Sequence, residues 1–128
     1  ADPARVKQGV AETRAGLPRK GLPVVVIHGT DDGLIPPAFS SAPYVQQAKA
    51  AGRDARYWQV RNAQHFDGFL ALPDYGARYV PLLPYVYSAL DRVSAHLDDK
   101  ANALPADAVI DTKPRGAQPL TAEHLAIP

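Results

Sequence analysis

The 128-residue sequence has no cysteine, which excludes disulfides, thiol catalysis and thiolate metal sites. It also has no apolar run near the roughly 20 residues that a membrane-spanning helix needs. Its 14 basic residues are balanced by 13 acidic ones, so the net charge is only +1. We therefore expect neither nucleic acid nor membrane among its partners. The start lacks a signal-peptide pattern, so either the chain is not targeted or its true N-terminus is missing.

Proline is abundant, with 13 residues, and it concentrates at segment ends and in the tail. Between these breaks, periodicity and composition predict helices and strands in alternation: a helix over 3–16, a strand over 23–29, a helix over 40–51, a strand over 54–62 and a helix over 81–99. This order indicates an α/β fold with a parallel sheet.

The two expected strands differ in pattern. Residues 23–29 form a continuous apolar run, typical of a strand buried on both faces. Residues 54–62 alternate, so we expect that strand nearer the sheet edge. Two strands cannot close a core, and the chain therefore looks like part of a larger domain or a partner for other strands. Residues 101–128 show no periodicity and are expected to be an extended tail, packed on the domain or loose.

Polar groups follow both strands at their carboxyl ends. Asp31 and Asp32 come after the first strand, and His65 comes after the second. Adjacent parallel strands lie roughly 5 Å apart, so a carboxylate of the first loop can reach an imidazole in the second. A carboxylate that holds one nitrogen of a histidine leaves the other free to take a proton. That pair is two thirds of a nucleophilic hydrolase site.

The loop "HGTDDGLIP" resembles the acid loop of α/β-hydrolases, whose pattern is Gly-x-x-Asp-x-x-Val-Pro. Gly29 and Pro36 bracket the pattern and Ile35 stands for the valine. The resemblance places the acid on Asp32 and makes Asp31 a neighbour that shapes the loop.

The histidine fits the same family order, in which the acid precedes the histidine. His65 lies 33 residues after Asp32, although many members have a glycine where this chain has Gln64. Three longer stretches narrow the likeness to D-(−)-3-hydroxybutyrate oligomer hydrolases, and together they cover about residues 21–116: "VVVIHGTDDGLIPPAFSSAPYV", "YWQVRNAQHFDGFLALPDYGARYVPLLPYVYSALD" and "VIDTKPRG".

The resemblance implies a serine esterase that cuts hydroxybutyrate oligomers to monomers in polyhydroxybutyrate degradation. Residues 1–100 would be the C-terminal segment of its α/β-hydrolase catalytic domain, with Asp32 and His65 as catalytic residues and no cofactor. Its partners would be a small ester and the missing N-terminal part of the enzyme. The family suggests a secreted or periplasmic location, and the sequence leaves a cytoplasmic one open.

The nucleophile elbow of this fold, Gly-x-Ser-x-Gly, is absent. None of the serines, at positions 40, 41, 88 and 94, stands between paired glycines. In this fold the serine precedes the acid, so it would lie before residue 1. We therefore expect this chain to be inactive alone.

Other residues near these loops have competing interpretations. Asp67 is a rival acid, while His28 is expected to be a packed strand-end residue. An apolar acyl pocket is predicted at Leu34, Phe66 and Phe69, with core packing as the alternative. The spacing of the histidines and aspartates matches no metal motif, so no metal site is expected.

Two other functional hypotheses remain open. One is another α/β-hydrolase, of feruloyl-esterase or prolyl-peptidase type, in which only the substrate changes. The other is a non-catalytic binding module that keeps the C-terminal strands of the fold.

Overall fold

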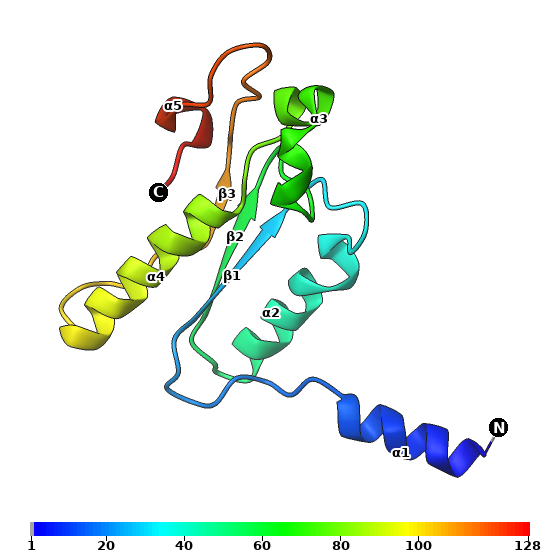
Figure 1. The fold of residues 1–128 in the computed structure, drawn as a ribbon. Coiled ribbons are helices and arrows are strands. Elements are labelled where there is room, and N and C mark those ends of the chain that lie inside the picture. The colour runs from blue at the N-terminus through cyan, green and yellow to red at the C-terminus, as the bar shows by residue number, and fades with distance from the viewer. Residues whose placement is uncertain (1) are drawn as a thin grey trace.

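The protein, described by a computed structural model over residues 2–128, is built around a small parallel sheet (Figure 1). The strands β1 (Val24–Gly29), β2 (Ala55–Val60) and β3 (Ala108–Ile110) lie in the order β1-β2-β3, and both pairings are parallel. The chain is therefore of α/β class, as the alternation of helix and strand patterns predicts.

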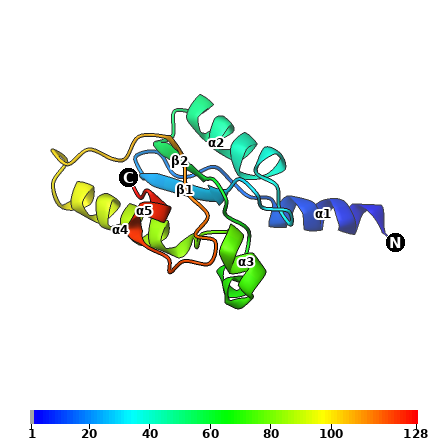
Figure 2. The same cartoon turned by 90° about the horizontal axis from the view of Figure 1, so that it is seen from above.

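Helices lie on both faces of the sheet, with α2 on one side and α4 on the other (Figure 2). The helical segments are α1 (Pro3–Thr13), α2 (Ser41–Ala50), α3 (Pro73–Arg78), α4 (Leu83–Asp98) and α5 (Ala122–Leu125), with 3-10 turns η1 (Pro37–Phe39) and η2 (Asp67–Ala71). Helix α1 stands apart from the sheet and buries none of its residues (Figure 1). None of the helices described over residues 2–128 is long and apolar enough to cross a membrane.

Strand β2 supplies both apolar cores through its alternating side chains. Trp58 and Val60 pack with Tyr85 of α4, and all three are fully buried. On the opposite face, Tyr57 packs with Val45 of α2. The alternation predicted for this strand is confirmed, and it fixes the strand between two helical layers.

The prediction that residues 54–62 lie nearer the sheet edge is wrong, because β3 pairs with β2 on its far side. Strand β3 and helix α5 lie in the segment 101–128, where the sequence indicates no regular structure. Hydrogen bonds from β2 hold this segment: Trp58 Nε1 donates to the Ala106 carbonyl at 3.0 Å, and the Tyr57 amide donates to Asp107 at 2.9 Å. These contacts join residues far apart in the sequence, so no local periodic pattern in residues 101–128 predicts them.

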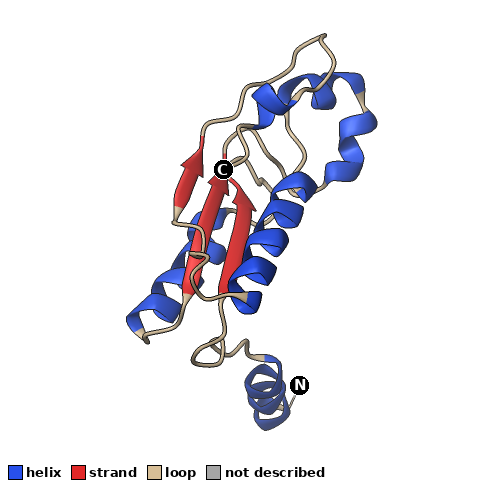
Figure 3. Cartoon of the chain, turned by 90° about the vertical axis from the view of Figure 1, so that its left-hand side faces the viewer, coloured by secondary structure: helices blue, strands red, loops and turns tan. Residues whose placement is uncertain are grey.

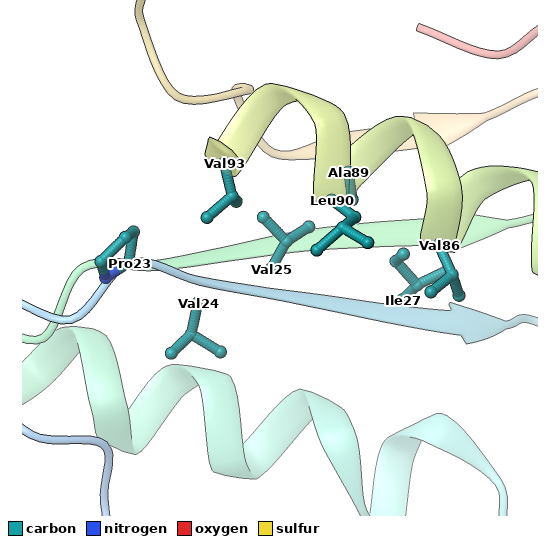
Figure 4. Close-up of a pocket in the computed structure, with 8 residues that line it drawn as sticks. All are labelled: Pro23, Val24, Val25, Ile27, Val86, Ala89, Leu90 and Val93. Atoms are coloured by element: carbon teal, nitrogen blue, oxygen red, sulfur yellow. The ribbon is translucent and has the colours of Figure 1, made fainter. Parts of the chain in front are cut away.

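Strand β1 lies at the open edge of the sheet (Figure 3). Most of its residues are only half-buried, so the expectation of burial on both faces is wrong for the described chain. An apolar groove of about 320 Å³ lies between β1 and α4 (Figure 4). Val25 and Ile27 of β1 point toward α4 there, while Val24 points toward the other face.

Candidate active site

The loop after β1 holds Asp32 in a fixed position. The residue is only 5% exposed. Its Oδ1 atom accepts hydrogen bonds from the backbone amides of Leu34 at 3.0 Å and Ile35 at 2.8 Å. Two donors on one oxygen fix the plane of the carboxylate and leave Oδ2 for other partners.

His65 is hydrogen-bonded to that second oxygen. Its Nδ1 atom lies 2.8 Å from Asp32 Oδ2, so the two strand-end loops meet as the parallel order predicts. Because a carboxylate only accepts, Nδ1 carries the proton and Nε2 has a free lone pair. Nε2 has no hydrogen-bond partner within residues 2–128, and the His65 side chain is 30% exposed. The imidazole can therefore accept a proton from a group that approaches through solvent.

Opposing effects set the protonation of Asp32. Burial alone would raise the pKa of its carboxyl. The hydrogen bonds from the Ile35 amide, from His65 and from the Leu34 amide together outweigh burial, and they hold the pKa below its ordinary value. Asp32 is thus a carboxylate near neutral pH and can stabilise a positive charge on His65.

His28 is a second histidine on the same carboxylate. Its Nε2 atom lies 3.1 Å from Asp32 Oδ2 and 3.0 Å from the Ile35 carbonyl oxygen. Both partners are acceptors, so Nε2 must be the protonated nitrogen. His28 is therefore not only a packed strand-end residue, because it also helps to hold the acid loop. Its spacing of four residues before Asp32, across the strand end, is the signal that could have found it.

Gly29 allows the two loops to approach closely. A Cβ atom at this position would lie 2.3 Å from the backbone oxygen of Ala63, which also accepts the Asp31 amide at 3.1 Å. No side chain fits such a gap unless the two strand ends separate.

We expect Gly29→Ala to lower the free energy of unfolding by about 1–3 kcal/mol, because the methyl group overpacks backbone that cannot move aside. Thermal unfolding of the protein measures this change. Gly33→Ala is the matched control, since a Cβ at Gly33 meets no atom within 4 Å. Equal melting temperatures for both variants would contradict the close approach of the loops.

Two polar residues, Gln64 and Asp31, lie next to the Asp32–His65 pair. Gln64, which departs from the family pattern, accepts the Gly33 amide at 3.3 Å and so links the two loops. Asp31 is exposed and accepts from the Thr30 hydroxyl at 2.8 Å. It lies beside the site, as a loop-shaping residue would.

Asp67, the rival acid, has a different task. Its carboxylate accepts the backbone amides of Leu82 at 2.8 Å and Leu83 at 2.9 Å, where α4 begins. These amides lie at the start of the helix, where backbone N–H groups have no partner within the helix, so Asp67 caps α4. Its negative charge also interacts favourably with the positive end of the helix dipole. The structure places its carboxylate on α4 and not on His65.

A pocket of about 330 Å³ opens beside His65. Its walls include all three residues predicted for an acyl pocket: Leu34, Phe66 and Phe69. The two phenylalanines are 49% and 50% exposed, so neither is packed in a core. The phenyl ring of Phe66 meets the His65 ring edge to face at 4.5 Å. Sequence reasoning missed three further lining residues: Tyr75, Arg78 and Tyr79.

Neither a metal cluster nor a serine joins the Asp32–His65 pair within residues 2–128. No group of three or more histidine and acidic side chains there could hold a metal ion. The Ser40 hydroxyl donates to the Pro36 carbonyl at 2.9 Å, and Ser41 pairs with the Tyr57 hydroxyl at 2.5 Å. In the described part of the chain no serine hydroxyl is hydrogen-bonded to His65.

Comparison with known families gives a match along the whole sequence. A family model described as 3HB-oligomer hydrolase (3HBOH) matches residues 1–128. The chain belongs to this family. Among its relatives is a D-(−)-3-hydroxybutyrate oligomer hydrolase of Polaromonas sp. (strain JS666 / ATCC BAA-500), 44% identical over 119 residues, which span 91% of this chain and 17% of the relative.

A second relative is a D-(−)-3-hydroxybutyrate oligomer hydrolase of Paracidovorax citrulli (strain AAC00-1). It is 41% identical over 128 residues, which span 94% of this chain and 18% of the relative. The chain thus spans less than a fifth of the length of these family members. No solved structure matches the chain.

Proposed function

We propose that this chain supplies the acid and the histidine of a serine esterase that hydrolyses D-(−)-3-hydroxybutyrate oligomers to monomers. Asp32 and His65 form its catalytic pair, and the serine lies in another part of a longer protein. Family membership supports the substrate, since the relatives are named for these oligomers.

One observation carries the proposal: the 2.8 Å contact between His65 Nδ1 and the buried, ionised Asp32. The contact leaves Nε2 unpaired within residues 2–128 beside a pocket of about 330 Å³. Ligand pockets commonly have about 300–1,000 Å³, so this volume suits a small ester. A buried acid, an oriented imidazole and an adjacent apolar pocket are what ester hydrolysis needs from this part of the site.

In the proposed reaction the serine hydroxyl attacks the ester carbonyl while His65 Nε2 takes its proton. Asp32 stabilises the imidazolium that forms. His65 then gives the proton to the departing alkoxide, and an acyl-serine remains. Water attacks this ester, His65 again moves the proton, and the second acid product leaves. No metal or cofactor enters any of these steps.

The fold that we propose for the whole protein is an α/β-hydrolase, with residues 1–100 as the C-terminal segment of its catalytic domain and 101–128 as an extended tail packed on that domain. The acid and the histidine follow adjacent parallel strands, and helices cover both faces of the sheet. In such a protein a further strand would pair with the open edge of β1, and its flanking structure would cover the apolar groove beside α4 (Figure 4).

Amide hydrogen exchange tests the proposed strand at β1. The amides of Val24 and Thr30 donate to Asp54 and Val60 across the β1–β2 boundary. By the two-residue period of a strand, the amides of Val25 and Ile27 point to the open edge. If another strand pairs there in the whole protein, both should exchange slowly, on the order of 100-fold or more below an unpaired amide. Fast exchange at both, beside a slow Val24, would contradict the pairing.

Activity of the whole protein tests the function. Purified protein is assayed with hydroxybutyrate dimer, a feruloyl ester and a proline-containing peptide, with product release measured by chromatography. The proposal predicts hydrolysis of the dimer above the other two. A preference for the feruloyl ester or the peptide would indicate a different hydrolase, and no hydrolysis of any substrate would favour a binding module.

A further inference from the structure

The pocket beside His65 contains one permanent charge. Most of its wall is aromatic or aliphatic, but Arg78 lines it at the end of α3. The guanidinium is fixed from two sides: Nε donates to the Asp74 carbonyl at 3.2 Å, and the group lies 5.5 Å from the centre of the Tyr79 ring. These two contacts place the Arg78 guanidinium at the wall of the pocket.

This guanidinium has no carboxylate partner within residues 2–128. Two other arginines do have one: Arg56 pairs with Asp54 at 2.7 Å and Arg61 with Asp111 at 2.6 Å. The remaining N–H groups of Arg78 are therefore available to a ligand. A guanidinium binds a carboxylate through two parallel hydrogen bonds. Arg78 is exposed, so such a ligand can reach it from solvent.

The proposed substrate carries the matching group. A hydroxybutyrate oligomer ends in a carboxyl group, which is ionised at neutral pH. In the dimer, a single methylene separates this carboxylate carbon from the carbon that bears the leaving oxygen. A carboxylate held by one wall of the pocket therefore brings the leaving oxygen into the same small space as His65.

We infer that Arg78 binds the terminal carboxylate of the oligomer and so selects short acidic esters whose scissile bond lies next to the free acid. This inference rests on the proposed function. When the bond between acyl carbon and oxygen breaks, the proton on His65 Nε2 passes to the oxygen of the departing hydroxybutyrate, whose carboxylate stays on Arg78. Arg78 acts as a binding residue and takes no part in the proton transfers.

The test compares two substrates in the whole protein: the hydroxybutyrate dimer and the same dimer with its acid end blocked as a methyl ester. Cleavage of the internal ester is followed by chromatography. In the Arg78→Leu variant, the ratio of kcat/KM for the acid over the blocked dimer should fall by about 10- to 100-fold, the effect of one charged hydrogen-bonded pair. Arg78→Lys keeps the charge but not the planar fork of the guanidinium, so its ratio should lie between those of wild type and Arg78→Leu.

Arg92→Leu is the matched control, because it removes one positive charge from α4, outside the lining of the pocket. It should leave the ratio of the two kcat/KM values unchanged. An unchanged ratio in Arg78→Leu and Arg78→Lys would overturn the inference while the esterase function stands. An equal fall in Arg92→Leu would also overturn it, because the effect would then come from net charge. If the wild-type protein cleaves neither substrate, the proposed function fails and the inference fails with it.

Discussion

Asp32→Asn is expected to lower kcat of the whole protein on hydroxybutyrate oligomers by about 10⁴-fold while the fold stays intact, as tautomer loss does in the serine-protease template. The backbone amides of Leu34 and Ile35 donate to Oδ1, so the amide oxygen of the new asparagine would take that place. Its NH₂ group would then face His65 Nδ1. Nδ1 would become the acceptor and Nε2 would carry the proton, which leaves no base for the serine. Steady-state kinetics and circular dichroism measure the two parts of this result.

The neighbouring aspartate supplies the control for this substitution. Asp31→Asn changes an exposed residue whose carboxylate accepts from the Thr30 hydroxyl, and kcat should stay within about twofold of wild type. If Asp31→Asn and not Asp32→Asn stops turnover, the acid has been assigned one residue too late. A small and equal effect of both substitutions would contradict a catalytic acid in this loop.

His65→Ala is expected to have the larger effect, a loss of about 10⁶-fold in kcat, because the variant has no group to accept the serine proton. The side chain is part exposed and lies outside both apolar cores, so its removal should leave the melting temperature within a few degrees of wild type. Kinetics of the purified variant on the dimer, with thermal unfolding beside it, separates catalysis from folding.

His124→Ala is the matched control, because the His124 imidazole is hydrogen-bonded to Thr121 at the start of α5, away from the Asp32–His65 pair. It should keep wild-type kcat. A His65→Ala protein that retained a tenth of wild-type activity would exclude His65 as the general base.

Much of the site follows from strand order alone. The apolar run of β1 and the alternation of β2 predict two adjacent parallel strands, and their polar loops must then share one edge of the sheet. The sequence therefore predicts that Asp32 and His65 approach each other, and the structure places them 2.8 Å apart. Strand order was enough here because each residue lies in the short loop within five residues of the end of its strand.

The remaining features depend on contacts that no local pattern encodes. Strand β3 is only three residues long, and hydrogen bonds from Tyr57 and Trp58 position the chain beside it. Asp67 caps a helix that begins more than a dozen residues later, so its role depends on the path of the loop between. Arg78 lines the pocket from the end of α3, a six-residue helix that lies outside the helices predicted from the sequence.

Covalent labelling of the whole protein with a fluorophosphonate probe tests most directly whether the Asp32–His65 pair activates a serine. The probe reacts with a serine only when a base raises its nucleophilicity. We predict that wild-type protein is labelled on one serine outside residues 1–128 and that His65→Ala is not labelled. Labelling at the wild-type rate in His65→Ala, or no labelling of the active wild-type protein, would contradict the assignment.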